Sequence, residues 1–158
     1  RMSLALRRAS AEGRDTCATL VPRQAERLGD ATLLKFEDET VSYAGFERGV
    51  NRFADHLRRE GVRKGDVFAL VMQNSPSFLM AEAAAAKLGA VAALVNHHLV
   101  GAALEHVLEA GQPRLVVADA AAADQARLDI LSGIAAGYAG DVAEDVDAAI
   151  ALLGLGSG

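Results

Sequence analysis

The stretch from Gly65 to Asp119 constrains the fold more than any other part of the sequence, because short apolar runs alternate in it with helical patterns. The apolar runs are Val67–Met72, Val91–Val95 and Leu115–Ala118. Runs of this length and composition are typical of buried parallel strands. Two successive crossovers predict a parallel sheet with right-handed connections. We therefore expect an α/β fold, with a parallel βαβαβ sheet flanked by helices.

Residues at the joints of this stretch support the expected boundaries. Ser75 is a good N-cap, and Pro76 follows it at the first helical position, where a missing N–H costs nothing. Gly89 can adopt the left-handed conformation that ends the first helix. We expect Gly111 and Pro113 to end the second helix before the third strand.

The residues before this stretch predict two helices and a β-hairpin. A short helix is expected from Thr19 to Leu28, with Gly29 as its terminator. The hairpin is expected over Ala31–Tyr43, with a polar turn at Glu37–Glu39 and with the apolar members Leu33, Phe36 and Val41.

A second, amphipathic helix is expected to begin after Ser42 and to end at Gly61. Ser42 is its expected N-cap. Apolar residues at helical spacing give it one face for the core, namely Phe46, Val50, Phe53, Ala54 and Leu57.

The pattern divides the chain into three segments. Residues 1–18 are expected to be a flexible N-terminal arm, and residues 19–131 an α/β subdomain. Residues 132–158 carry a weaker pattern and are expected to form a loop and a helix of a truncated region. Helical patterns occupy 120–131 and 144–153.

Composition and charge exclude several classes of function. The 158 residues carry a formal net charge of −5, which argues against nucleic acid as the main partner. Cys17 is the sole cysteine, so no internal disulfide is expected and a reducing compartment is the default. The most apolar stretch, Phe78–Val95, is interrupted by charges and by Gly89, so no membrane-spanning segment is expected. These features indicate a cytoplasmic protein, with peripheral membrane association left open.

Candidate ligand-binding residues follow the strands, because open parallel sheets bind ligands beyond the carboxyl ends of their strands. Those ends carry Gln73–Ser75, Asn96–His98 and Asp119. The residues that we place near a substrate are Asn74, Asn96 and His97.

No catalytic, cofactor-binding or metal-binding residue follows from these loops alone. The first loop lacks the closely spaced glycines of a dinucleotide-binding turn, and no Walker-type Gly-Lys-Ser/Thr occurs in the chain. Adjacent residues of an extended chain point to opposite sides, so His97 and His98 are not expected to share a metal ion, even with help from His106. Ser75 is explained as a helix cap.

A basic run lies at the end of the amphipathic helix and in the turn after it. Its members are Arg52, Arg58, Arg59, Arg63 and Lys64. Such a run is compatible with a phosphate site, but the sequence favours a solvated helix face and turn.

From Phe36 to Asp119 the sequence resembles the N-terminal part of adenylate-forming acyl-CoA synthetases. The resembling segments are TVSYAGFERGVNRFADHL, at residues 40–57, and GDVFALVMQNSPSFLMAEAAAAKLGAVAALVN, at residues 65–96. Further on, the spacing of Asn96, Leu99, Leu104 and His106 is similar. The resemblance is strongest to the very-long-chain acyl-CoA synthetase and fatty-acid-transport-protein branch.

This resemblance implies a two-step ligase of fatty-acid and lipid metabolism. ATP and a fatty acid would form an acyl-adenylate with loss of pyrophosphate, and CoA would then take the acyl group as a thioester. ATP, Mg²⁺ and CoA are the implied cofactors and cosubstrates of the complete enzyme.

The motifs with which the family handles ATP are not found in these residues. The Ser/Thr/Gly-rich phosphate loop ending in Pro-Lys, the Thr-Glu motif, the ribose-binding Asp and the lid Lys are all missing. We therefore expect the chain to be inactive alone and to expose apolar surface that promotes self-association. Two alternatives remain open: a noncatalytic α/β interaction or dimerisation module, and a stand-alone α/β enzyme that uses Asn74, Asn96 and His97.

Overall fold

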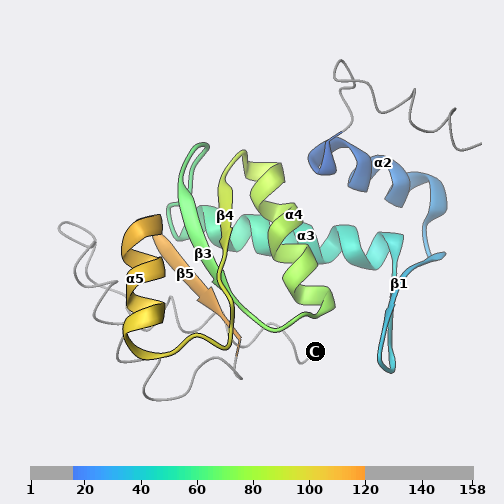
Figure 1. Cartoon of the computed structure of the whole chain (residues 1–158). Helices are drawn as coiled ribbons and strands as arrows, with labels where there is room; N and C mark the ends of the chain where they lie inside the picture. The colour runs from blue at the N-terminus through green and yellow to red at the C-terminus, as the bar shows by residue number, and fades with distance from the viewer. Residues whose placement is uncertain (1–15, 120–158) are drawn as a thin grey trace, which may run out of the picture.

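The computed structural model describes residues 16–119 (Figure 1). The predicted helices over 120–131 and 144–153 lie outside the described residues, as does most of the predicted arm. In chain order the elements are α2 (Cys17–Leu28), β1 (Thr32–Phe36), β2 (Glu39–Ser42), α3 (Tyr43–Arg59), β3 (Val67–Val71), α4 (Pro76–Leu88), β4 (Val91–Leu94), α5 (Gly101–Gly111) and β5 (Leu115–Ala118).

The central element is a parallel sheet of β3, β4 and β5, which confirms the predicted βαβαβ unit. The strand order is β4–β3–β5, so β3 lies in the middle. Phe68 of β3 pairs with Ala92 on one side and with Leu115 on the other. Starting from β3, the chain thus places β4 on one side of that strand and then β5 on its other side.

Two apolar clusters cover the two faces of this sheet. Phe68 and Leu70 of β3 belong to the larger cluster, which α3 and α4 complete. Ala69 and Val71 belong to the smaller cluster, which α5 completes with Leu104. Because successive side chains of a strand point to opposite faces, α4 and α5 lie on opposite sides of the sheet. Figure 1 shows this three-layer arrangement.

The capping residues of α4 are those that the sequence predicts. The Ser75 hydroxyl accepts a hydrogen bond from the Phe78 amide at 3.1 Å, and Pro76 is the first helical residue. Gly89 has left-handed backbone angles (φ 69°, ψ 22°).

The end of α5 differs from the prediction. Gly111 is still helical, and Gln112 adopts the left-handed conformation after it (φ 43°, ψ 52°). Pro113 supplies the physical reason, because a proline disfavours the right-handed helical conformation in the residue before it.

Helix α3 presents to the core the face predicted from its spacing. Its buried residues include all five predicted ones, and Gly49 joins them. The Ser42 hydroxyl accepts a hydrogen bond from the Gly45 amide at 3.0 Å, which confirms Ser42 as the cap. Gly61 follows the helix with a positive φ of 84°.

The hairpin of β1 and β2 has a tighter turn than the sequence predicts. Phe36 pairs with Glu39, so only Glu37 and Asp38 form the turn and Glu39 belongs to β2. The predicted apolar member Leu33 is wrong, because Leu33 is exposed and Leu34 packs against the core. Leu34 lies two positions before Phe36, and alternate residues of a strand share a face, so these two half-buried side chains lie on one face and Leu33 lies on the other.

Helix α2 begins at Cys17, two residues before the predicted start, and ends at Leu28. Val21 packs against the larger cluster. The Gly29 amide donates to the Ala25 carbonyl at 2.9 Å, and its φ of 50° confirms it as the terminator. Across residues 16–119, no helix combines the length and apolar character needed to cross a membrane.

Candidate functional site

The predicted ligand loops lie together at one edge of the sheet. The loop after β3 leads to α4 on one face, and the loop after β4 leads to α5 on the other face. Adjacent parallel strands whose connections leave on opposite sides create a crevice between their loops. Topology therefore places the candidate site between Gln73–Ser75 and Asn96–His98.

Asp119 connects the third strand to this edge. Its Oδ2 accepts a hydrogen bond from the Gln73 amide at 2.7 Å, and its own amide lies 3.3 Å from the Val71 carbonyl. The carboxylate thus holds the residue just before Asn74 in the loop after β3. Asp119 was predicted to follow a strand at this edge, but its link to Gln73, across 46 positions of the sequence, has no local sequence signal.

Asn96 organises the second loop. Its Oδ1 accepts a hydrogen bond from the His98 amide at 2.9 Å, and its carbonyl accepts one from the Leu99 amide at 3.0 Å. Asparagine side chains commonly make such bonds to the backbone two residues on, and they stabilise turns. Asn96 is exposed, and within residues 16–119 its side-chain amide nitrogen forms no hydrogen bond.

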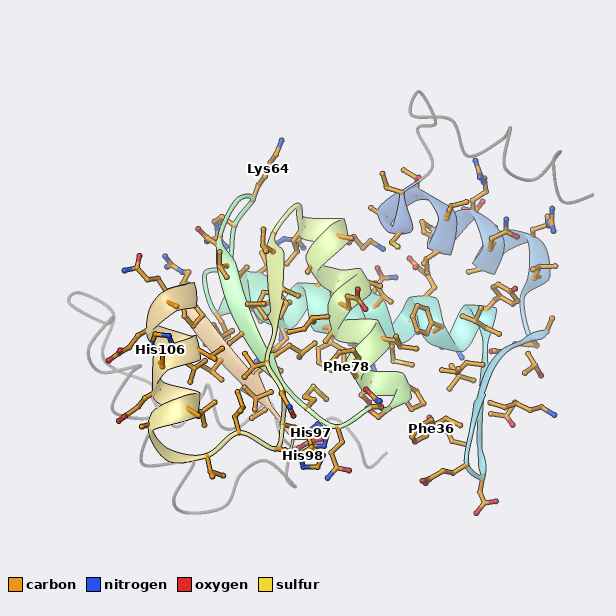
Figure 2. The ribbon with its side chains drawn as sticks, in the orientation of Figure 1. Phe36, Lys64, Phe78, His97, His98 and His106 are labelled. Atoms are coloured by element: carbon orange, nitrogen blue, oxygen red, sulfur yellow. The ribbon has the colours of Figure 1, made fainter. Side chains whose placement is uncertain are left out.

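The two histidines of this loop contact each other, contrary to the expectation that they point to opposite sides. Their ring centroids lie 4.0 Å apart, with the planes tilted by 41° (Figure 2). The expectation was wrong because His97 and His98 lie in a turn, where side chains do not alternate as they do in a strand.

The predicted site residues are not all in contact with one another. Across residues 16–119, no hydrogen bond connects Asn74 to Asn96 or His97. His106 lies on α5, away from His97 and His98 (Figure 2). No group of three or more His, Cys, Asp or Glu residues in the described chain is arranged to hold a metal ion.

These groups suit binding better than bond-breaking. Amide and imidazole groups can donate and accept hydrogen bonds to a polar ligand. The Ser75 hydroxyl is committed to the Phe78 amide at 3.1 Å, and no histidine forms a hydrogen bond with it within residues 16–119. The described edge therefore offers polar contacts and no nucleophile paired with a base.

Comparison with known proteins identifies the family of this fold. The family model of AMP-binding enzymes matches residues 21–149, which is most of the chain. The medium/long-chain-fatty-acid–CoA ligase FadD6 of Mycobacterium tuberculosis is 36% identical over 101 residues, which cover 64% of this chain and 17% of that protein. A crotonobetaine/carnitine–CoA ligase of Salmonella paratyphi A is also 36% identical over 101 residues, covering 61% of this chain and 20% of that protein.

Solved structures give the same assignment. The N-terminal domain of FACL13 from Mycobacterium tuberculosis superposes with a TM-score of 0.65 at 30% identity, covering 69% of this chain and 28% of that one. The O-succinylbenzoate coenzyme A synthetase of Bacillus subtilis, solved with AMP, superposes with a TM-score of 0.59 at 29% identity, covering 63% and 26%. The chain spans about a fifth of the length of the curated relatives that it matches. It therefore belongs to the family of AMP-binding enzymes and corresponds to the N-terminal part of the adenylate-forming ligases in it.

Proposed function

We propose that this chain supplies the N-terminal scaffold of a ligase that joins a fatty acid to CoA. The observation that carries the proposal is the 36% identity to FadD6 over 101 residues, together with the 30% identical fold of the FACL13 N-terminal domain. FadD6 is named as a medium/long-chain-fatty-acid–CoA ligase. The βαβαβ unit from Gly65 to Asp119 forms the centre of the scaffold.

The proposed reaction has two steps. A carboxylate oxygen of the fatty acid attacks the α-phosphorus of ATP, and the bond from that phosphorus to pyrophosphate breaks to give an acyl-adenylate. The CoA thiol, giving up its proton to a base, then attacks the acyl carbon and displaces AMP. Mg²⁺ is implied by the family resemblance, but residues 16–119 hold no cluster suited to a metal ion, so no step is assigned to such an ion here.

Within this reaction the described residues bind and position rather than transform. We assign to Asn74, Asn96 and His97 a place beside the substrate site, at the edge where the loops after β3 and β4 meet. The chain alone is expected to be inactive, because the groups that would handle ATP in the family are not found in its sequence.

The acyl substrate is proposed to be a fatty acid. The very-long-chain and fatty-acid-transport-protein branch is supported only by the segments at residues 40–57 and 65–96. The named relatives act on medium- or long-chain fatty acids and on crotonobetaine or carnitine, and they do not favour that branch in particular.

Two measurements test the scaffold role. The purified 158-residue chain is expected to give no fatty-acid-dependent exchange of pyrophosphate into ATP, and robust exchange would overturn its proposed inactivity. A chimera in which residues 16–119 replace the matching segment of FadD6 is expected to form acyl-CoA, with unaltered FadD6 as the positive control. A chimera that folds, as judged by a cooperative thermal transition, but makes no acyl-adenylate would overturn the scaffold role.

The assignment of the loop residues needs a separate test in the same chimera. Changing Asn74, Asn96 and His97 together to alanine is expected to lower kcat/KM without lowering the thermal midpoint. The matched control changes His106 and Gln112 to alanine, because both are exposed polar residues away from this edge. An unchanged kcat/KM in the triple variant would remove these residues from the site.

One observation favours the alternative of an interaction module. β4 is at an edge of the described sheet, its sequence VAAL carries no charge, and Val91 and Leu94 are 53% and 54% exposed. Uncharged edge strands readily pair with another chain. Self-association would appear as concentration-dependent mass in sedimentation, and Leu94→Lys would abolish it; a monomer at every concentration would count against this alternative.

A further inference from the structure

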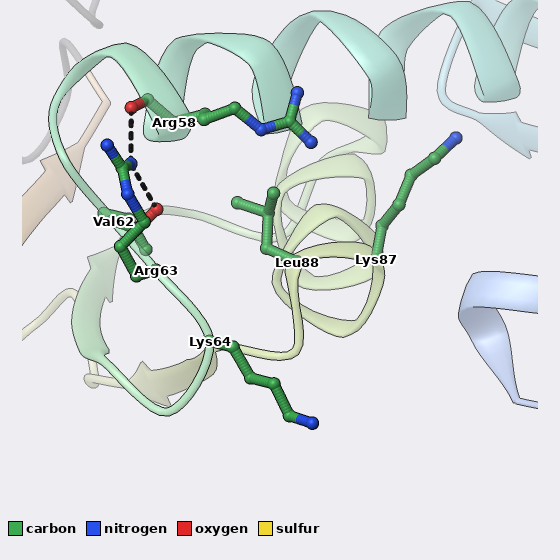
Figure 3. Close-up of a pocket in the computed structure, with 6 residues that line it drawn as sticks. All are labelled: Arg58, Val62, Arg63, Lys64, Lys87 and Leu88. Atoms are coloured by element: carbon green, nitrogen blue, oxygen red, sulfur yellow. Dashed lines mark hydrogen bonds between the residues drawn. The ribbon is translucent and has the colours of Figure 1, made fainter.

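A basic depression of roughly 440 Å³ lies at the edge of the sheet opposite the candidate site. It is lined by Arg58, Val62, Arg63, Lys64, Lys87 and Leu88 (Figure 3). These residues end α3 and α4 or precede β3, so the depression lies at the amino ends of the strands. Figure 2 shows Lys64 and the histidine pair at opposite ends of the sheet. The proposed ligase function makes no use of this depression.

Local backbone structure brings the two sides of the depression together. The turn after α3 uses positive φ angles at Gly61 (84°) and Gly65 (88°). The Gly65 amide donates to the Gly89 carbonyl at 2.9 Å, which ties this turn to the end of α4. The stem of Lys64 lies over Gly89, where an added Cβ would come within 3.0 Å of the Lys64 Cγ.

The cations of the depression differ in how far acids neutralise them. Arg58 pairs with Asp55 at 3.0 Å, and Lys87 pairs with Glu47 at 2.7 Å. The Arg63 Nη1 donates to two backbone carbonyls, those of Arg58 (2.9 Å) and Val62 (3.1 Å).

Arg63 and Lys64 keep uncompensated charge. Within residues 16–119, no salt bridge joins either side chain to an acid. The nearest acid on the same turn is Asp66, whose Oδ2 accepts from the backbone amide of Arg63 at 2.7 Å and lies 3.9 Å from Arg114 Nε. Arg63 lies near the negative end of the α3 dipole, which attracts its positive charge. The two bonds to backbone carbonyls fix the orientation of its guanidinium group.

We propose that this depression binds a phosphate group. Among the described residues, four cationic side chains and no acid line it, and guanidinium and ammonium groups are common partners of phosphate in proteins. Val62 and Leu88 provide a small apolar floor for the group that carries the phosphate. Of the basic run singled out in the sequence, Arg58, Arg63 and Lys64 form part of the site, whereas Arg52 and Arg59 do not line it and fit the solvated-face interpretation.

Titration of the ¹⁵N-labelled 158-residue chain with inorganic phosphate, at constant ionic strength, tests the proposal. Amide shifts are expected to saturate at Arg63, Lys64 and Leu88. Arg58→Glu with Lys64→Glu should weaken binding by roughly tenfold or more, because two charge-assisted contacts become repulsive. Arg52→Glu with Arg59→Glu is the matched control, since it alters the net charge equally, on the helix that also carries Arg58, at two residues that do not line the depression.

Two arms distinguish the source of the phosphate. Saturable shifts with inorganic phosphate, and no binding to phosphatidylcholine vesicles containing phosphatidic acid, indicate a soluble phosphate ester. Co-sedimentation with those vesicles that the Arg58/Lys64 variant abolishes indicates a lipid headgroup. The proposal is overturned if neither probe binds, or if the control variant weakens binding as much as the test variant while both keep the wild-type thermal midpoint.

Discussion

Gly49 of α3 and Met80 of α4 approach so closely that a Cβ added to Gly49 would lie 2.2 Å from the Met80 Sδ. Both residues are buried, and they lie where the two helices pack on one face of the sheet. Glycine at this position lets α4, which runs from the candidate edge to the basic depression, approach α3 closely.

Gly49→Ala is therefore expected to destabilise the chain. Overpacking of a core costs about 1–3 kcal/mol, and the better helix propensity of alanine returns only about 1 kcal/mol. The free energy of unfolding, measured by urea denaturation followed by circular dichroism, should fall by up to about 2 kcal/mol. In a Met80→Ala background the same change should become stabilising, because the sulfur is gone. A loss of equal size in both backgrounds would show that this contact is not the cause.

A second link between α3 and α4 is polar. Lys87 Nζ lies 2.7 Å from Glu47 Oε1 and also donates to the Asn51 Oδ1, and the two charged side chains are only 30% and 15% exposed. Lys87→Met should cost about 1–2 kcal/mol, because it leaves Glu47 partly buried without its cation. A double-mutant cycle with Glu47→Gln should give a coupling of about 1 kcal/mol.

The exposed pair Arg58–Asp55 is the matched control for this prediction. Its side chains are 60% and 61% exposed, so solvent screens the charges. The same cycle should give about 0.5 kcal/mol or less for that pair. Equal coupling for the two pairs would contradict the view that partial burial strengthens the contact between Lys87 and Glu47.

Local chemistry explains why much of the fold is predictable from the sequence. Ser42 and Ser75 act as caps, and Gly89 takes a left-handed conformation, for reasons that lie within a few residues of each. The errors lie at single positions near the ends of elements. Leu34 rather than Leu33 packs against the core, because Leu34 shares a strand face with Phe36, and the helix that was expected to end at Gly111 includes it and is capped by Gln112.

The two possible sites were predictable to different degrees. The loops at the carboxyl edge follow from the order of strands and helices, yet the contact between His97 and His98 depends on a turn that their sequence does not specify. Lys87 lies on α4, 23 positions after Lys64, so the basic run of α3 and the following turn does not predict that Lys87 lines the depression. Strand order and helix packing, which unite these residues, are tertiary properties.

Ser75→Ala tests whether Ser75 is a cap. Loss of its bond to the Phe78 amide should reduce the free energy of unfolding by about 1 kcal/mol, and Ser75→Asp should retain most of it, because aspartate is also a good N-cap. Ser77→Ala, two residues into α4, should change stability by less than about 0.5 kcal/mol. If Ser75→Asp were as destabilising as Ser75→Ala, the role of Ser75 as a cap would be refuted.

Asp119→Ala tests whether the carboxylate holds the loop after β3. The bond from the Gln73 amide to Asp119 Oδ2 is short but exposed, so we assign it about 1 kcal/mol. Hydrogen exchange of the Gln73 amide should therefore accelerate roughly fivefold. The exchange rates of the amides inside β3 should change only by the factor that corresponds to the change in the global free energy of unfolding. Asp119→Asn keeps an acceptor oxygen and should show a smaller effect. Unchanged exchange at Gln73 in Asp119→Ala would mean that the edge carrying Asn74 is positioned by the strand alone, and that the link between β3 and β5 adds nothing to the order of the candidate site.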